Sequence, residues 1–161
     1  MTILSQVRLL LIGLWLGAAI FFSTGVAPTL FSVLRSFHLP NANEIAGTVV
    51  TRVLGIVNLA GVAISLSLLL TAPLVARSRA ARLGEMFSLG ILGLMTGLNQ
   101  WAISPKMVAL RAAMELPIDR MAKGDPRVVA FDNLHKYSVA SLTIAMVAAL
   151  IAFLLIARAE R

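Results

Sequence analysis

The chain has 161 residues, of which 59% are hydrophobic and 13% are charged, and its mean hydropathy is +0.91. A soluble domain of this size could not bury so much apolar surface, so the composition indicates a membrane protein. The net charge of +7 does not indicate nucleic-acid binding, because the basic residues stand in short clusters between apolar segments without interleaved aromatic residues. Cysteine is absent, which excludes disulfides, thiolate metal sites and cysteine nucleophiles.

Four apolar segments are each long enough to cross a bilayer, which takes about 20 residues of helix. They cover approximately residues 9–34, 53–76, 84–105 and 137–157. The first is too long for a signal peptide, and Phe21 and Phe22 stand where a cleavage site would lead into polar sequence. We therefore expect a single all-α domain over residues 1–161, an integral membrane four-helix bundle.

Two helices are expected to extend beyond the apolar segments. Asn41 and Glu44 stand at the spacing of a capping box, so the second helix should begin well before Arg52. The third should continue through Pro105 into residues 106–115, with a bend because Pro105 cannot donate to the carbonyl of Trp101. No internal repeat is evident.

Each predicted helix carries a stripe of small or polar residues, through which membrane helices pack closely. In chain order the stripes are Gly13, Gly17, Thr24, Pro28; Thr51, Gly55, Asn58, Ser65; Gly90, Gly93, Gly97, Gln100, Ser104; and His135, Ser138, Ala145, Ala149, Ala152. We expect Asn58 and Gln100 to form hydrogen bonds between helices, and Leu92 to point away from the glycine stripe.

The distribution of Lys and Arg bears on orientation. The termini and the loop Ala76–Arg82 hold six of these residues, and the other side holds eight. The short loop ARSRAAR nevertheless concentrates three arginines without an acidic residue, whereas the longer loop from Lys106 to Lys136 mixes basic with acidic residues. We therefore expect both termini to be cytoplasmic.

Most chemically versatile residues fall toward the end of the bundle opposite ARSRAAR, and the ARSRAAR end is expected to be chemically plain. We predict one shallow polar pocket bordered by Pro28, Gln100, Arg111 and His135, which come from three helices. We expect an anionic or hydrogen-bond-accepting ligand, because Arg111 carries a fixed positive charge and Gln100 and His135 can donate. The alternative is four separate structural roles: a kink, an interhelical bond, an anchor and a helix start.

Metal binding is a further hypothesis, because His38, His135 and Glu44 are expected on the same side. No HxxxH, HxH or ExxH spacing supports it, so we expect no metal and no cofactor. His135 is either a proton-carrying or ligand-contacting group oriented by Asp132, or an interfacial histidine bonded to a neighbour.

Arg35, Arg52 and Arg111 suggest binding of an anionic lipid headgroup, or simple anchoring at the membrane edge. No nucleophile-elbow sequence positions a serine, so no catalytic residue is assigned.

Three stretches together resemble the transmembrane protein 205-like family: LWLGAAIFFSTGVAPTLFSVL, NQWAISPKMVALRA and FDNLHKYSVAS. This family comprises four-span membrane proteins with many uncharacterised bacterial members. The resemblance implies the four-span fold and no agreed biochemical activity. It draws attention to the family-like positions Phe22, Pro28, Phe31, Pro105, Arg111, Phe131 and His135.

We expect a multi-pass protein of a bacterial inner membrane that acts as a non-enzymatic binding, transport-associated or partner-stabilising component. The expected partners are the lipid bilayer and an anionic lipid or small anionic ligand. A membrane-protein partner or homo-oligomer is left open, and nucleic acid is not expected. The alternative function is a membrane-embedded enzyme acting on a lipid-soluble substrate, with His135 as acid or base.

Overall fold

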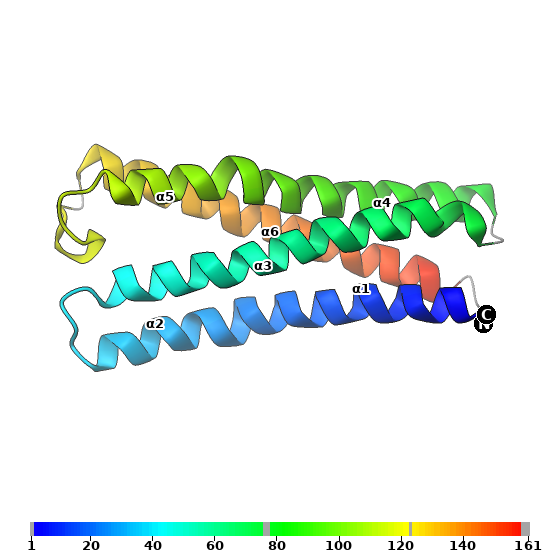
Figure 1. The fold of residues 1–161 in the computed structure, drawn as a ribbon, viewed down its shortest axis with the longest axis horizontal. Coiled ribbons are helices and arrows are strands. Elements are labelled where there is room, and N and C mark those ends of the chain that lie inside the picture. Colours follow the sequence, from blue (N-terminus) through cyan, green and yellow to red (C-terminus); the bar gives the residue numbers. More distant parts are fainter. Residues whose placement is uncertain (1, 76–77, 123, 159–161) are drawn as a thin grey trace.

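The computed structural model describes residues 2–75, 78–122 and 124–158. Within these residues every element is helical, and four long helical segments run antiparallel along the molecule (Figure 1). They cover Ile3–Ser36, Ala42–Leu74, Arg79–Ala112 and Pro126–Arg158, and each is long and apolar enough to cross a membrane. The all-α prediction is confirmed, and every segment begins before the corresponding predicted span. Ala76, Arg77 and Arg161, which entered the predictions of spans and orientation, lie outside the described residues.

Two of these segments contain one π-helical turn. The first segment comprises α1 (Ile3–Phe21), the π-helical η1 (Phe22–Val26) and α2 (Ala27–Ser36). The third comprises α4 (Arg79–Leu98), the π-helical η3 (Asn99–Ile103) and α5 (Ser104–Ala112). The second is α3 (Ala42–Thr71) with the short turn η2 (Ala72–Leu74), and the fourth is α6 (Pro126–Arg158). A further turn, η4 (Ile118–Arg120), lies between α5 and α6.

The start of α3 is capped from a distant loop. Helix α3 begins before Arg52, as predicted, but the predicted capping box is wrong, because the Asn41 side chain makes no capping hydrogen bond. Instead, Asp119 accepts from the backbone N–H groups of Asn43 and Glu44 at 3.3 and 3.1 Å. A carboxylate at this position satisfies unpaired amides and complements the helix dipole. The loop between α5 and α6 is thereby tied to α3.

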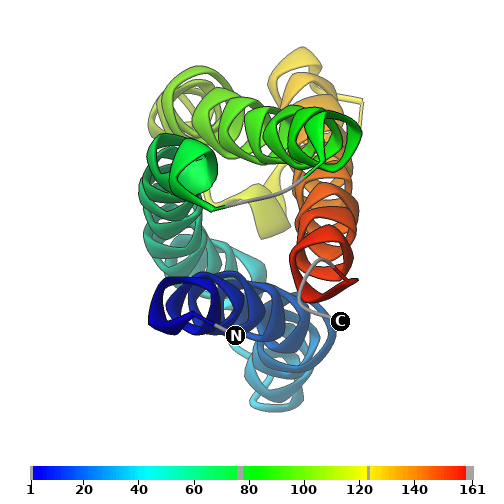
Figure 2. The ribbon, with the colours of Figure 1, turned by 90° about the vertical axis from the view of Figure 1, so that its right-hand side faces the viewer.

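Seen along the bundle, the helices form a ring in the order α1, α3, α4, α6 (Figure 2). The centre of the ring is packed with buried apolar side chains, including Ile12, Trp15, Leu68, Leu89, Leu92 and Ile156. Leu92 is 0% exposed, so the face of α4 that it occupies is buried in the core, next to the face that carries the glycines.

The small residues of α3 and α6 face other helices, as predicted: Asn58 and Ser65 are buried, as are Ser138, Ala145, Ala149 and Ala152. In α4, a Cβ added at Gly93 would lie 2.5 Å from Oγ of Ser65, so two helices touch there. Nothing lies within 4 Å of a Cβ added at Gly90. The stripe predicted for the first helix is wrong, because Gly17, Thr24 and Pro28 are exposed, and the buried face instead carries Ser5, Arg8, Ile12, Trp15 and Ala19.

The hydrogen bonds between helices also differ from the prediction. Within the described residues, both polar atoms of the buried Asn58 side chain and Oε1 of Gln100 have no partner. Asn99 and Ser138 form the buried contact between η3 and α6: the Ser138 hydroxyl donates to Oδ1 of Asn99 at 2.9 Å, and Nδ2 of Asn99 donates to the Ser138 carbonyl at 3.3 Å. Trp15 joins α1 to α3 through a 2.9 Å bond from Nε1 to the carbonyl of Val57.

The two halves of the chain repeat one layout that the sequence does not reveal. Each half is a helical hairpin: the first hairpin (residues 3–74) and the second hairpin (residues 79–158) both begin with a helix carrying a π-helical turn followed by proline. With an offset of 77 residues, the buried positions Arg8, Ile12, Trp15, Ala19 and Phe22 correspond to the buried positions Glu85, Leu89, Leu92, Thr96 and Asn99. The ring in Figure 2 has the order expected if the hairpins are related by an approximate two-fold rotation about the bundle axis.

The end of the bundle near the ARSRAAR loop contains a buried ion pair. Arg8 of α1 pairs with Glu85 of α4, and both side chains are 1% exposed. Arg8 also donates to the hydroxyl of Thr71 in α3. The prediction that this end is chemically plain is therefore wrong. The two charges stand near the ends of the predicted spans 9–34 and 84–105, and the packed bundle encloses them together.

Candidate ligand-binding site

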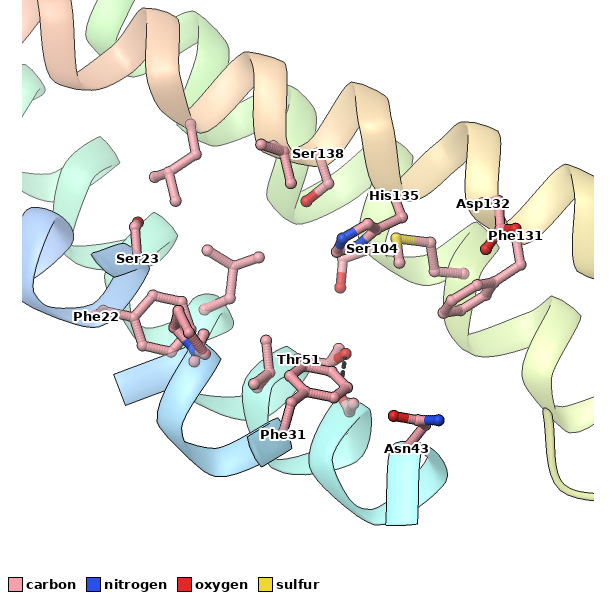
Figure 3. A pocket seen from close by; sticks show the side chains of 18 of the residues that line it. Phe22, Ser23, Phe31, Asn43, Thr51, Ser104, Phe131, Asp132, His135 and Ser138 are labelled. Atoms are coloured by element: carbon pink, nitrogen blue, oxygen red, sulfur yellow. Dashed lines mark hydrogen bonds between the residues drawn. The ribbon is translucent and has the colours of Figure 1, made fainter. Parts of the chain in front are cut away.

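The bundle widens toward the long loop (Figure 1). A cavity of about 540 Å³ lies there between the two hairpins (Figure 3). This volume is within the range of about 300–1,000 Å³ that small-molecule sites occupy. The first hairpin contributes residues of η1, α2 and α3, and the second contributes residues of α5 and α6. Ile118 and Asp119 of the connecting loop complete the wall.

The π-helical turn η1 borders this cavity, and η3 ends directly before the lining residue Ser104; each turn is followed by a proline. The backbone N–H of Ala27 bonds to the carbonyl of Phe22, and that of Ser104 bonds to the carbonyl of Asn99. Pro28 and Pro105 come next; a proline lacks the N–H of a helical bond, and its ring collides with the carbonyl four residues earlier. A wider turn relieves that collision, and such turns occur frequently at functional sites. The local sequence therefore explains why each of these two helical segments contains a wider turn just before its proline.

The deep part of the cavity is apolar. Its wall includes Phe22, which is 5% exposed, and Leu142, which is 8% exposed. Leu54 and Met146 line the same region. These side chains come from η1, α3 and α6, so a ligand there contacts three of the four long helices.

Arg111 crosses from α5 to α3 at the edge of the cavity. Its Nε lies 3.2 Å from Oε1 of Glu44, an ion-pair contact that is not aligned as a hydrogen bond. Nη1 donates to the Thr48 hydroxyl at 3.4 Å, and the guanidinium lies 5.1 Å from the ring centre of Phe131. A Cβ at Gly47 would approach Nη2 to 2.5 Å, so glycine provides the room for this crossing. The positive charge of Arg111 is therefore already partnered by Glu44.

Arg35 is the lining arginine whose charge is not matched by an ion pair within the described residues. Its Nε donates to Oδ1 of Asn43 at 2.8 Å, and its guanidinium lies 5.6 Å from the ring centre of Phe31. The residue is exposed at the mouth of the cavity. Arg52 is exposed as well but is not part of the lining, so the predicted group of three arginines does not converge.

His135 lies on α6 and points into the cavity beside Ser104, while Asp132 lies nearer to Phe131 (Figure 3). Within the described part of the chain, no hydrogen bond joins Asp132 to His135 and no other group orients the imidazole. The two ring nitrogens of His135 can therefore donate and accept hydrogen bonds with a ligand in the cavity.

Three of the four residues predicted to border one pocket line this cavity: Pro28, Arg111 and His135. Gln100 does not. Its Oε1 is buried against α3, 3.7 Å from the position of a Cβ added at Gly55. The prediction for Gln100 assumed regular helical phase, which the π-helical turn Asn99–Ile103 breaks because each such turn contains an extra residue. That these residues bind a ligand stays a prediction.

Sequence reasoning missed several residues of the cavity. The sequence marks Phe22 and Phe31 only as family-like positions and Thr51 only as part of a packing stripe, yet all three line the cavity. No pattern in the sequence indicates that Asp119 and Ile118 would reach the wall, because their place depends on how the long loop folds back. In the described residues, no three metal-binding side chains come together, and His38 lies outside the lining.

The fold and the cavity define a class of protein: a multi-pass membrane protein of four helices with a ligand-sized cavity at one end. A family model described as a domain of unknown function, DUF4149, matches residues 10–115, and the chain belongs to this family. The matched part ends before α6 and therefore before His135. No curated protein and no solved structure matches the chain.

Proposed function

We propose that this protein is a non-enzymatic membrane component that binds a small ligand in the cavity at the long-loop end. The observation that carries the proposal is the cavity itself, to which all four long helical segments contribute and which the π-helical turn η1 borders. Such a cavity leaves helix surface unpacked inside a small bundle, where close packing is the rule. A bound ligand restores the lost contacts. Its role in the membrane is transport-associated or partner-stabilising.

The ligand carries an anionic or hydrogen-bond-accepting group. Arg35, Ser104 and His135 supply donors from three different elements of the wall. Arg35 takes the role first predicted for Arg111, because the charge of Arg111 is partnered by Glu44.

The alternative function, an enzyme acting on a lipid-soluble substrate with His135 as acid or base, has weaker support. A general acid or base works best when another group holds it in position. Within the described residues, His135 has no such hydrogen bond. The resemblance to the transmembrane protein 205-like family, with no agreed activity, supports neither function over the other.

The binding proposal is tested by filling the mouth of the cavity. Val139 lines it and is 52% exposed, whereas Val147 lies further along α6, is 53% exposed and is not part of the lining. Thermal unfolding of the purified protein in detergent is measured with inorganic phosphate and with dodecyl phosphate. We expect at least one probe to raise the unfolding midpoint of the wild type and of Val147→Trp, but not of Val139→Trp. If neither probe stabilises the wild type, the proposed function is wrong.

We propose that the protein lies in a bacterial inner membrane, as the family resemblance suggests, and that both termini are cytoplasmic, as the arginine-rich loop suggests. Because the chain has no cysteine, single cysteines at Ser78 and Gly124 report topology when intact cells are treated with an impermeant reagent. We expect labelling at Gly124. Labelling at Ser78 but not at Gly124 reverses the orientation.

A further inference from the structure

The residues that line the cavity change from apolar to polar along the axis of the bundle. Phe22, Leu142 and Met146 lie inside the apolar segments 9–34 and 137–157, whereas Arg35 and Asn43 lie beyond them. A bilayer changes in the same direction from hydrocarbon to headgroup. The cavity therefore presents apolar walls at the depth of lipid chains and polar walls at the depth of lipid headgroups.

One side of the cavity is closed by contacts between the hairpins. Arg111 of α5 reaches Glu44 of α3, and Asp119 binds the first amides of α3. These contacts join the two hairpins along α3 and α5 and hold the connecting loop over them. A ligand therefore does not enter through this side without breaking an ion pair and two hydrogen bonds.

The opposite side, between α2 and α6, is open. Helix α6 packs against α1, but beyond η1 the chain turns away, and α2 packs against α3 with at most slight contact to α6. Pro28 on α2 and Val139 and Thr143 on α6 line the cavity and are exposed at this gap. Val139 and Thr143 belong to the apolar segment 137–157, so the gap faces the hydrocarbon of the bilayer.

The polar groups at the rim select the headgroup. Arg35 has no described carboxylate partner and stands on the α2 side of the gap. Asp119 accepts from the side chain and backbone of Asn43, which also accepts from Arg35, and its other oxygen accepts from the amide of Glu44, so Asp119 reaches Arg35 only through Asn43. Asp132 lies on the α6 side next to Phe131 (Figure 3). An acidic group is therefore attracted to the α2 side, where a guanidinium suits the geometry of phosphate or carboxylate.

We infer that the ligand is a membrane amphiphile with an acidic headgroup, and that it enters sideways from the bilayer through the gap between α2 and α6. The headgroup binds at Arg35, and a chain occupies the apolar part of the cavity. This inference rests on the proposed function and adds to it the class of ligand and the route of entry. A free anion such as phosphate offers the same headgroup chemistry without the chain.

The route is tested with a photoreactive residue placed at Thr143 or at Ile144. These neighbours lie at the same depth, but Thr143 lines the gap, whereas Ile144 is 47% exposed and lies outside the cavity lining. The full chain is reconstituted in nanodiscs of mixed phosphatidylcholine and phosphatidylglycerol. We expect the crosslinks from position 143 to be several-fold enriched in phosphatidylglycerol relative to those from position 144. Equal lipid composition at the two positions overturns the inference.

The headgroup contact is tested with Arg35→Gln and with Arg52→Gln as the matched control, since Arg52 is exposed outside the cavity. We expect Arg35→Gln to abolish the enrichment and to weaken dodecyl phosphate binding about tenfold, the effect of one charge-assisted hydrogen bond. Arg52→Gln should change neither. Stabilisation by inorganic phosphate but not by dodecyl phosphate overturns the inference that the ligand is an amphiphile and leaves the proposed binding function intact. Stabilisation by neither probe overturns the inference and the proposed function.

Discussion

Replacing Arg8 by methionine is expected to destabilise the bundle, because the Glu85 carboxylate is left buried without its cationic partner. Both side chains are 1% exposed, and Arg8 also holds the hydroxyl of Thr71 on a third helix. Removing one member of a buried ion pair typically costs about 3–5 kcal/mol, most of it from the uncompensated charge. Replacing both members, with Arg8→Met and Glu85→Leu together, removes both charges and should leave the stability near that of the wild type.

The measurement is the free energy of unfolding in mixed micelles titrated with a denaturing detergent, for the wild type, both single variants and the double variant. The cycle isolates the coupling between the two side chains, because each single variant removes the same interaction. We expect each single variant to be less stable than the double variant by about 3 kcal/mol. If the effects of the two single substitutions simply add in the double variant, the two charges are not coupled and the described packing at this end is incorrect.

Three further predictions concern packing and titration. Gly93→Leu should cost about 1–3 kcal/mol through overpacking, whereas Gly90→Leu, which meets open space, should leave detergent stability unchanged; equal losses contradict the assigned face. Asn58→Leu should raise or preserve stability because it removes a buried amide without a described partner, and a clear loss shows that the amide is satisfied in the membrane. In the loop before α6, hydrogen bonds from the side chain and backbone of Arg127 lower the pKa of Asp125 below its ordinary value of 3.8. The stabilising effect is present above the unfolded-state pKa and is lost as pH falls through the lower folded-state pKa, and an NMR titration should show that Arg127→Gln raises the pKa of Asp125.

The sequence by itself determined the class of fold. Lipid offers no partner for backbone groups, so a chain with four apolar segments of membrane-spanning length forms four helices that satisfy their own hydrogen bonds. It also indicated which faces of α3 and α6 pack inward, because the spacing of Asn58 and Ser65, and of Ala145 and Ala149, is a property of each helix alone. The sequence also placed Pro28 and His135 at the same end of the bundle. The number of membrane crossings between two residues decides whether they lie at the same end, and this number follows from the apolar segments alone.

Tertiary structure decided everything that depends on the rotation and splay of helices relative to one another. Arg8 and Glu85 stand 77 residues apart, and their pairing requires two helices to face each other across the bundle. Asp119 caps α3 in place of a local residue because the long loop folds back onto that helix. The π-helical turn Asn99–Ile103 rotates the following residues relative to a regular helix, so the helical spacing that predicts Gln100 in the cavity does not hold. Such contacts result from the packing of the whole bundle, so no local spacing or composition encodes them. The cavity lies where the first helical segment, which packs against α6 along α1, no longer packs against it along α2. This separation depends on the positions of two helices from opposite halves of the chain.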